Sequence, residues 1–300
     1  MAGTVLGIDL GGTKLLAIGL DAGGREVYRR RELTGRGLGP ELALALIAEI
    51  VDDARRTLGG PDAIDAIGLG FPGLVDHHRG VARSSVMLDG WHEVELAAQL
   101  TARVDAPCAI DNDVNVAALH ELALRGSSAL LFVAVGTGIG GALVLDGKLW
   151  RGAHGLAGEI GHVAIARDGR PCNCGRRGCV NRYASGTAID QLDDQLDGGP
   201  DGQPDGGLAD ATAALGSAIG SALNLLDVPL VVLGGGVAER GPTYLEAVAA
   251  HARRECFREI GLACTFELAR GGYDAAALGA ALLARQARHA ASSGSMRERT

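Results

Sequence analysis

Apolar residues in the first part of the chain form short continuous runs that alternate with longer runs of helical spacing. Short apolar runs bounded by glycine or proline are typical of buried strands, and apolar positions three and four residues apart are typical of helices. We therefore predict strands over residues 4–10, 15–20 and 63–71 and from 109 onward, with helices over 41–58, 91–101 and 114–124. Strands separated by helices in this way predict an α/β fold.

The second part of the chain begins with a repeat of the first. The strand, glycine turn and strand of residues 6–20 recur over 131–145, so that Gly11 falls on Gly136 and Asp21 on Asp146, a shift of 125 residues. An internal repeat of this kind predicts two related lobes. Asp9 of the first copy falls on Ala134 of the second, so the lobes are expected to share a shape but not a charge.

The later residues return to the same pattern after a polar interruption. Residues 190–210 are rich in Asp, Gly, Pro and Gln and predict a mobile acidic loop. Helical spacing returns over 211–226, and the apolar run 230–233 predicts a short buried strand. A last helix is expected over 275–289, and 290–300 are expected to form a frayed tail.

Composition narrows the class of partner. Net charge is −8 and aromatic residues make up 3% of the 300 residues. There is no basic block for nucleic acid and little aromatic surface to stack on bases. No apolar run reaches the ~18 residues of a membrane span, and the N-terminus lacks a basic start followed by an apolar stretch. We expect a cytoplasmic protein that binds a small molecule, with no nucleic acid or membrane partner.

The first glycine turn carries groups suited to phosphate. Amides at Gly11 and Gly12 can approach phosphate oxygens closely, Thr13 adds a hydroxyl, and Lys14 adds a positive charge. Asp9, at the end of the preceding strand, could hold a magnesium ion directly or through water. The alternative is an ordinary hairpin turn with a charged flank, because short glycine patterns are weak signals.

Two further glycine turns favour a nucleotide site. One contains Gly136, Thr137 and Gly138, and the other contains Gly234 and Gly235; each follows an apolar strand. Glycines after strands also occur for packing alone. Three such turns with one acidic residue at the first are better explained by a nucleotide held between two lobes.

Asp111-Asn112-Asp113 stands between a predicted strand and a predicted helix. A carboxylate there can accept the proton of an attacking hydroxyl while the neighbouring amide orients the substrate. A helix cap is the alternative, because Asp and Asn are favoured at that position in any protein. The local sequence leaves both interpretations open.

A cluster of metal-ligand residue types gives the sharpest pattern. Cys172, Cys174 and Cys179 lie within eight residues, and His162 precedes them. Three thiolates and one imidazole suffice for a closed tetrahedral zinc site, which would be structural. The alternative is free thiols or a strained local disulfide. The remaining cysteines are interpreted as small buried hydrophobic residues: Cys108, Cys256 and Cys264.

Together these motifs resemble the ROK family (repressors, open reading frames and kinases), especially its glucokinase branch. The resemblance runs from about Leu6 to Leu282 and rests on four segments: Asp9-Leu10-Gly11-Gly12-Thr13-Lys14, Gly136-Thr137-Gly138-Ile139-Gly140-Gly141, Asn112-Asp113, and His162 with the three cysteines. It implies two actin-like (ribonuclease H-like) α/β lobes with the active site in the cleft between them. The expected division is an N-terminal lobe over 1–112, a larger lobe over 113–282, and a helix end and tail over 283–300.

The resemblance also implies an activity: ATP-dependent transfer of phosphate to the 6-hydroxyl of a hexose, with Mg²⁺ and a structural Zn²⁺. Asp113 would be the general base, and Asp9 would face magnesium and phosphates. The sugar side would be formed by Asn112, Glu159, His162, Asn181 and Gly73. Gly234 and Gly235 would lie near the adenosine, and His162 would touch zinc through one ring nitrogen and sugar through the other. A homodimer is expected.

Two departures from the family pattern concern the sugar pocket. Asn181 stands where family glucokinases usually have Glu, which touches the hydroxyls around C1 and C2, and Val86-Met87-Leu88 replaces a typical Pro-Asn-Leu. The sequence therefore favours an altered pocket that suits an amino sugar or tolerates several hexoses. The phosphoryl donor stays open between ATP and polyphosphate.

Two other classes of protein are alternatives to a kinase. A repressor of this family would carry a DNA-binding segment before the sugar domain, and here the phosphate motif begins at about residue 6. A non-catalytic sugar-sensing protein would be expected to lose Asp113 or the phosphate turns, and both are present.

Overall fold

The computed structural model describes residues 3–35, 37–196 and 206–297, which form two compact units. The first unit contains the chain up to Arg125, Gly152–Leu156 and the segment from Tyr273 onward; the second contains Gly126–Arg151 and Ala157–Gly272. The sequence-based division at 112/113 placed residues 113–125 and the start of the last helix in the second lobe. In the structure, α3 (Asp113–Arg125) and α9 (Ala275–Arg297) belong to the first unit, because both pack on its sheet.

The sheet of the first unit has five strands in the order β3-β2-β1-β4-β8. Their bounds are β1 (Thr4–Leu10), β2 (Lys14–Leu20), β3 (Glu26–Leu33), β4 (Ile64–Phe71) and β8 (Cys108–Asn112). The first three strands form an antiparallel meander, whereas β4 runs parallel to β1 and β8 parallel to β4.

The sheet of the second unit repeats this topology. Its order is β11-β10-β9-β12-β13, with antiparallel pairing among the first three strands and parallel pairing of β12 with β9 and β13. The bounds are β9 (Leu130–Val135), β10 (Ile139–Leu145), β11 (Lys148–Trp150), β12 (Leu230–Gly234) and β13 (Thr265–Leu268). Matching order and direction confirm that the sequence repeat encodes two related lobes, and the actin-like α/β prediction is confirmed.

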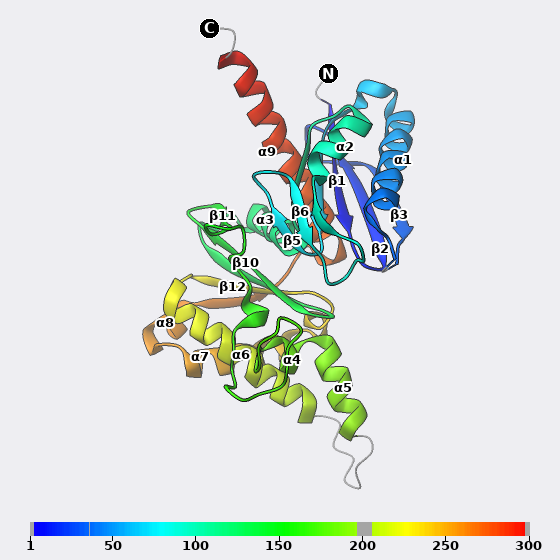
Figure 1. Cartoon of the computed structure of the whole chain (residues 1–300). Coiled ribbons are helices and arrows are strands. Elements are labelled where there is room, and N and C mark those ends of the chain that lie inside the picture. The colour runs from blue at the N-terminus through cyan, green and yellow to red at the C-terminus, as the bar shows by residue number, and fades with distance from the viewer. Residues whose placement is uncertain (1–2, 36, 197–205, 298–300) are drawn as a thin grey trace. The chain divides into compact units, whose positions relative to one another are not determined.

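Helices cover both faces of the first sheet (Figure 1). Leu6, Ile8 and Leu10 of β1 share a core with α1 (Pro40–Leu58) and α2 (Leu96–Val104). Val5 and the alternate residues of β2 pack instead against the alanines of α9, as the two-residue period of a strand requires. Helix α9 lies so close that a Cβ on Gly7 or Gly68 would collide with its backbone.

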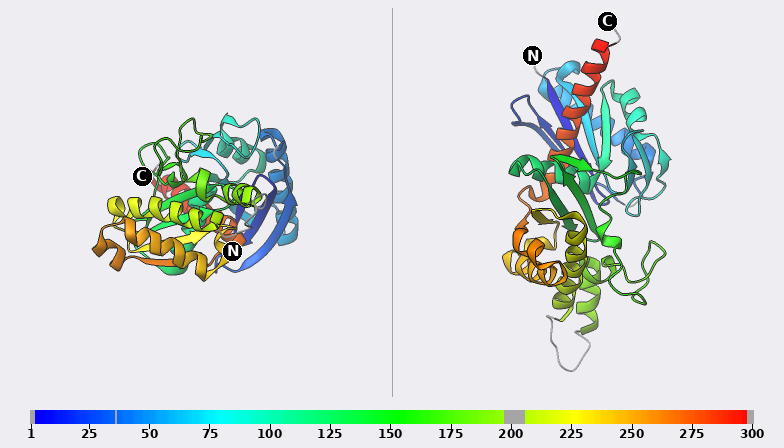
Figure 2. Two further views of the ribbon diagram at one scale, coloured as in Figure 1. Left: turned by 90° about the horizontal axis from the view of Figure 1, so that it is seen from below. Right: turned by 90° about the vertical axis from the view of Figure 1, so that its left-hand side faces the viewer.

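The second sheet packs on two helices that run side by side, α6 (Gly206–Leu226) and α7 (Pro242–Glu255) (Figure 2). A Cβ on Gly216 or Gly220 would meet the α7 backbone, so these two glycines set the spacing between the helices. The described residues of this unit also form three shorter α-helices: α4 (Asn181–Ala184), α5 (Gly186–Leu196) and α8 (Arg258–Ala263).

The helix predicted over 91–101 is wrong at its start. Residues His92–Val94 form β7, which pairs with β6 (Val81–Ser84) in a small sheet with β5 (Leu74–Asp76), and α2 begins at Leu96. Trp91 packs on Phe71 with ring centroids 4.7 Å apart, so tertiary contacts override the local helical spacing.

Two polar or terminal segments are more helical than predicted. The acidic loop expected over 190–210 is helical at both ends, in α5 and α6, and its middle, 197–205, lies outside the described residues. The frayed tail predicted over 290–300 is also wrong, since α9 continues to Arg297; 298–300 lie outside the described residues.

Among the residues that the structure describes, we find no helix with the length and apolarity needed to cross a membrane.

Candidate active site residues of the two units

The first glycine turn joins β1 to β2 and is closed by its own backbone. The Gly11 amide donates to the Lys14 carbonyl at 2.9 Å. Thr34, after β3, holds the same turn twice: its amide donates to the Thr13 carbonyl and its hydroxyl to the Gly11 carbonyl, both at 2.9 Å. The Gly11 amide therefore shapes the turn from within. A Cβ on Gly12 would meet the Met87 carbonyl at 3.3 Å, so Met87 lies against this turn.

Asp9 lies beside the N-terminus of α3. In the sheet register Asp9 is opposite Gly70, where a Cβ would be 3.5 Å from the Asp113 Cα. The pKa of Asp9 is raised to about 7, chiefly by burial and also by the Asp113 carboxylate, against the lowering effect of the Lys14 ammonium. The structure thus brings together the predicted magnesium-facing carboxylate, the predicted base and the predicted phosphate-binding lysine.

Lys14 has an aromatic neighbour that the sequence did not reveal. Its Nζ lies 4.6 Å from the centroid of the Tyr273 ring, a cation–π contact. Arg29 of β3 binds the Asp274 carboxylate with both terminal nitrogens, at 2.7 and 3.1 Å, and so fixes the segment that carries Tyr273. No local pattern marks Tyr273, because 259 residues separate it from Lys14.

Asn112 caps helix α3, as one of the two interpretations from the sequence predicted. Its Oδ1 accepts the amides of Val114 at 2.9 Å and Asn115 at 3.2 Å. Its Nδ2 donates to the Gly73 carbonyl at 3.1 Å and has a second hydrogen to offer. The cap and a role in orienting a substrate are therefore compatible. Gly73 therefore acts through its backbone carbonyl, which holds the Asn112 side chain in place.

Buried polar groups hold the junction between β8 and α3 in place. Asp111 is 2% exposed and Asn115 is 5% exposed. Asp111 Oδ1 accepts the Asn112 amide and the Asn115 Nδ2, both at 2.8 Å. Sequence reasoning missed Asn115, because Asp111 lies in strand β8 and no helical spacing marks the pair.

The second glycine turn, between β9 and β10, resembles the first. The Gly136 amide donates to the Gly138 carbonyl at 2.8 Å, within the turn. From the start of α5, the Gly186 amide donates to the Gly136 carbonyl at 2.7 Å and the Thr187 hydroxyl to the Thr137 carbonyl at 3.0 Å. Each of the two glycine turns that are predicted to bind phosphate is therefore held by hydrogen bonds from another segment of its own unit.

The third glycine turn is packed against the second sheet. Gly235 has φ +84°, and a Cβ there would lie 2.5 Å from the Val135 carbonyl oxygen. The Val237 amide donates to that same oxygen at 2.9 Å. Packing alone therefore requires glycine at 235, and an adenosine contact stays a prediction for both Gly234 and Gly235.

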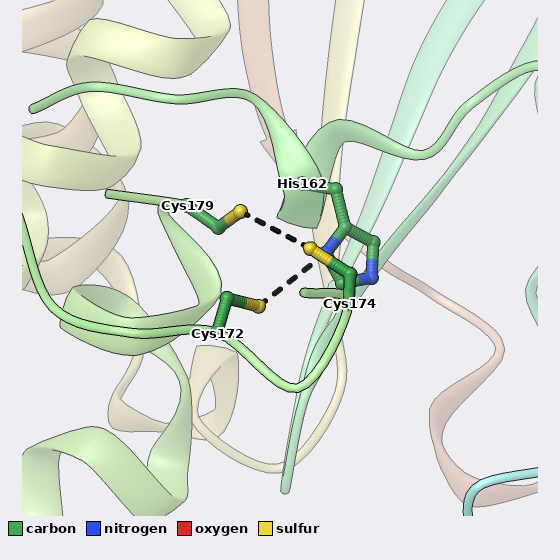
Figure 3. A group of neighbouring side chains, drawn as sticks. All are labelled: His162, Cys172, Cys174 and Cys179. Atoms are coloured by element: carbon green, nitrogen blue, oxygen red, sulfur yellow. Dashed lines mark hydrogen bonds between the residues drawn. The ribbon is translucent and has the colours of Figure 1, made fainter. Parts of the chain in front are cut away.

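The predicted metal ligands converge (Figure 3). One ligand atom from each of His162, Cys172, Cys174 and Cys179 lies within 4.8 Å of all the others. His162 Nδ1 is 3.7 Å from the Cys172 sulfur, and the Cys174 and Cys179 sulfurs are 3.6 Å apart. Tetrahedral zinc with bonds of about 2.0–2.3 Å spaces its ligand atoms about 3.5–3.8 Å apart, so the cluster fits this ion.

The backbone of the cysteine loop favours binding of a metal cation by this cluster. The Arg176 amide lowers the pKa of Cys174 to about 6, which favours the thiolate that binds metal. Gly175 and Gly178 have φ of +85° and +75°, a left-handed conformation that glycine adopts without steric cost. A Cβ on Gly178 would also collide with the Ala166 carbonyl, so glycine is needed at this position.

His162 links the metal cluster to a second polar side chain. Its Nδ1 faces the cysteines, and its Nε2 is 4.0 Å from a carboxylate oxygen of the exposed Glu159. If Nδ1 binds the metal, Nε2 keeps its hydrogen and can donate outward. This arrangement agrees with the expectation that the two ring nitrogens face different partners.

The chain is similar to proteins of one known family over nearly its whole length. The family profile described as "ROK family" matches residues 5–287. The chain belongs to the ROK family. A glucokinase of Halalkalibacterium halodurans is 30% identical, with 94% of each chain covered, and an N-acetylmannosamine kinase of Yersinia pseudotuberculosis is 37% identical over 62% of this chain and 63% of its own length.

Solved structures place this ROK protein among glucokinase-like relatives. A ROK glucokinase from Streptomyces griseus, solved with glucose and AMPPNP, has a TM-score of 0.81 and 29% identity, and the match covers 95% of this chain and 100% of that one. A ROK transcriptional regulator, a homologue of the E. coli MLC protein, has a TM-score of 0.85, with 96% of this chain and 79% of that chain covered. At 22% identity, this second match shows the fold alone.

The sites predicted for this ROK protein are divided between the two units. The first unit carries Asp9, Gly11, Gly12, Thr13, Lys14, Gly73, Asn112 and Asp113. The second unit carries Gly136, Thr137, Gly138, Glu159, His162, Asn181, Gly234, Gly235 and the three cysteines.

Metal removal is expected to destabilise the second unit. Cys179 is completely buried, so Cys179→Ser should abolish stoichiometric zinc and lower the free energy of unfolding by at least about 2 kcal/mol. Metal analysis and urea unfolding would measure both effects. Cys108→Ser is the matched control, because Cys108 lies outside the cluster and should keep the zinc content unchanged. A Cys179→Ser protein with one zinc per chain would contradict the assignment.

Proposed function

We propose that this protein is a sugar kinase that transfers the γ-phosphate of ATP to the 6-hydroxyl of a hexose. The observation that carries the proposal is the proximity of Asp113, Asp9 and Lys14 around the first glycine turn. This set combines a base, a carboxylate for a divalent cation and a positive charge, which are the parts that phosphoryl transfer needs. Similarity to glucokinase over 94% of the chain supports it.

In this proposal Asp113 takes the proton of the attacking sugar hydroxyl. Asp113 lies in the first turn of α3, which the Asn112 cap holds in place. The carboxylate is therefore oriented by a helix and not by a flexible loop. The Asp9 carboxylate would help to hold Mg²⁺, whose charge would offset the negative charge that develops on the phosphates. Asp9 would face that ion, and Lys14 and the Gly12 amide would face the phosphates.

Each unit carries candidate sugar-binding groups of its own. Asn112 offers the second hydrogen of Nδ2, His162 offers Nε2–H, and Glu159 offers a carboxylate acceptor. A site that pairs hydroxyls in this way rejects sugars that leave one of these groups unpaired. The second and third glycine turns would serve the nucleotide.

Substrate choice is expected to favour an amino sugar over glucose. Met87, an apolar residue, lies against the first turn, at the position where the family pattern has Asn. We would follow ADP release with glucose, N-acetylglucosamine, N-acetylmannosamine and 3-amino-3-deoxyglucose, and locate the phosphate on the product by NMR. Turnover greatest on an amino sugar with phosphate on O6 is expected. A clear preference for glucose would refute the amino-sugar assignment, although not the kinase.

A non-catalytic sugar sensor is the second candidate, favoured by the fold shared with a ROK regulator. It predicts sugar binding without ADP release. If the folded, zinc-loaded protein binds a hexose in calorimetry and releases no ADP with any sugar of the panel, the sensor replaces the kinase.

A further inference from the structure

Asn181 contacts the second glycine turn. Its Oδ1 accepts the Ile139 amide at 2.8 Å, and a Cβ on Gly138 would lie 3.5 Å from the same oxygen. Ile139 is the first residue of β10, directly after the turn. The side chain therefore fixes the point where the turn re-enters the sheet.

Asn181 is also next to the metal cluster. Only Val180 separates it from Cys179, and both of those residues are completely buried. The Val180 amide donates to the Val163 carbonyl at 2.9 Å, so the backbone leading into α4 is bound to the strand-like segment that follows His162. Two buried residues, bound to the segment after His162, thus join the cysteine loop to Asn181.

The segment from Asn181 to Thr187 holds the turn at three points. Besides the Asn181 contact, the Gly186 amide and the Thr187 hydroxyl bind the carbonyls of Gly136 and Thr137. The carbonyls at Gly136 and Thr137 and the amide of Ile139 are thus all engaged from the side of α4 and α5. A turn held in this way presents its free edge in one conformation, which reduces the entropy lost when phosphate binds.

We propose that Asn181 is a positioning residue that couples the metal cluster to the second glycine turn, and so sets the affinity for nucleotide phosphate rather than the choice of sugar. This inference rests on the proposed function and deepens it. It revises the expectation that Asn181 is a sugar contact, because the side-chain oxygen is engaged by a backbone amide of the turn.

The first test measures hydrogen exchange at the Ile139 amide in proteins with and without the acceptor oxygen of Asn181. Asn181→Ala should speed exchange of this amide at least about 10-fold, because the amide loses its partner. Asn181→Asp keeps an acceptor oxygen and should keep the slow exchange. Asn173→Ala is the matched control, because Asn173 is exposed in the cysteine loop. Equal exchange in Asn181→Ala and wild type would overturn the proposal.

The second test separates nucleotide from sugar. Calorimetry should show that Asn181→Ala raises the Kd for AMPPNP about 3- to 10-fold, the usual range for one lost hydrogen bond, while the Kd for the sugar changes less than about 2-fold. A changed sugar Kd or altered sugar preference with unchanged AMPPNP affinity would overturn the proposal. If the wild-type protein bound no nucleotide, the proposed function would fail. Exchange at the Ile139 amide would still test the hydrogen bond between Asn181 and Ile139.

The coupling to metal is tested by combining variants. Cys174→Ser, with its zinc content measured, should speed Ile139 exchange and weaken AMPPNP binding. In the Asn181→Ala background the same substitution should add little, because the connecting side chain is already gone. Fully additive effects of the two substitutions would show that the cluster does not act through Asn181.

Discussion

Asp113→Asn is expected to lower kcat by about 10²- to 10⁴-fold, the contribution usual for a general base. The variant should remain folded, because the Val114 amide donates to Asp113 Oδ1 at 2.9 Å and an asparagine oxygen can accept the same bond. The amide cannot take a proton from a sugar hydroxyl. The loss should therefore appear in kcat, while the Kd values for sugar and nucleotide stay within about 3-fold of wild type.

The control for this variant is Asp146→Asn, the same substitution at an exposed turn between β10 and β11. It should leave kcat unchanged. An Asp113→Asn enzyme that kept more than about a tenth of the wild-type kcat would remove Asp113 from the role of base. A variant that lost sugar binding together with kcat would assign Asp113 to substrate binding instead.

The sequence predicted the repeated hairpins because their signal is local and occurs twice. Strands β2 and β10 begin at Lys14 and Ile139, and the same strand order surrounds each of them. The metal cluster was equally readable, since three of its ligands lie within eight residues. In both cases the residue types and their spacing were sufficient, and no distant partner was needed.

The sequence failed where a distant partner decides the conformation. Residues His92–Val94 have the spacing of a helix, yet β6 supplies a strand to pair with. Residues 190–196 have the composition of a loop and nevertheless form part of α5. Local propensity is a weak guide in such segments because tertiary contacts outweigh it.

The same limit applies to the candidate site. The motifs identified which residues matter, but not what holds them: Asn181 lies 42 residues from Ile139, and Tyr273 lies 259 residues from Lys14. The sequence alone also could not decide between the two interpretations of Asn112. Only the structure shows one oxygen capping α3 while the amide nitrogen binds Gly73 and offers a second hydrogen.

Asp9→Asn is expected to stabilise the ligand-free protein and to abolish most of its activity. The pKa of Asp9 is raised from 3.8 to about 7 in the folded state. Between about pH 4 and 7 the unfolded chain has lost this proton while the folded protein still holds it. Stability therefore falls as pH rises through this window, and above pH 7 the full penalty of the buried charge is present. Asparagine carries no charge, so the variant lacks this penalty.

Urea unfolding without nucleotide or Mg²⁺ at pH 4.5, 6 and 8 would measure the effect. The Asp9→Asn variant should gain on the order of 2 kcal/mol over wild type at pH 8 and almost nothing at pH 4.5. The residue is half-buried rather than fully buried, so solvent reduces the roughly 4 kcal/mol that the shift implies. The exposed Asp62 supplies the control, Asp62→Asn, which should follow the wild-type pH profile. A site that keeps a destabilising carboxylate in the free protein has a functional reason to do so, since a divalent cation would relieve the charge when nucleotide binds. Adding Mg²⁺ with AMPPNP should accordingly stabilise wild type more than Asp9→Asn, and equal stabilisation of both proteins would contradict a metal-facing role for Asp9.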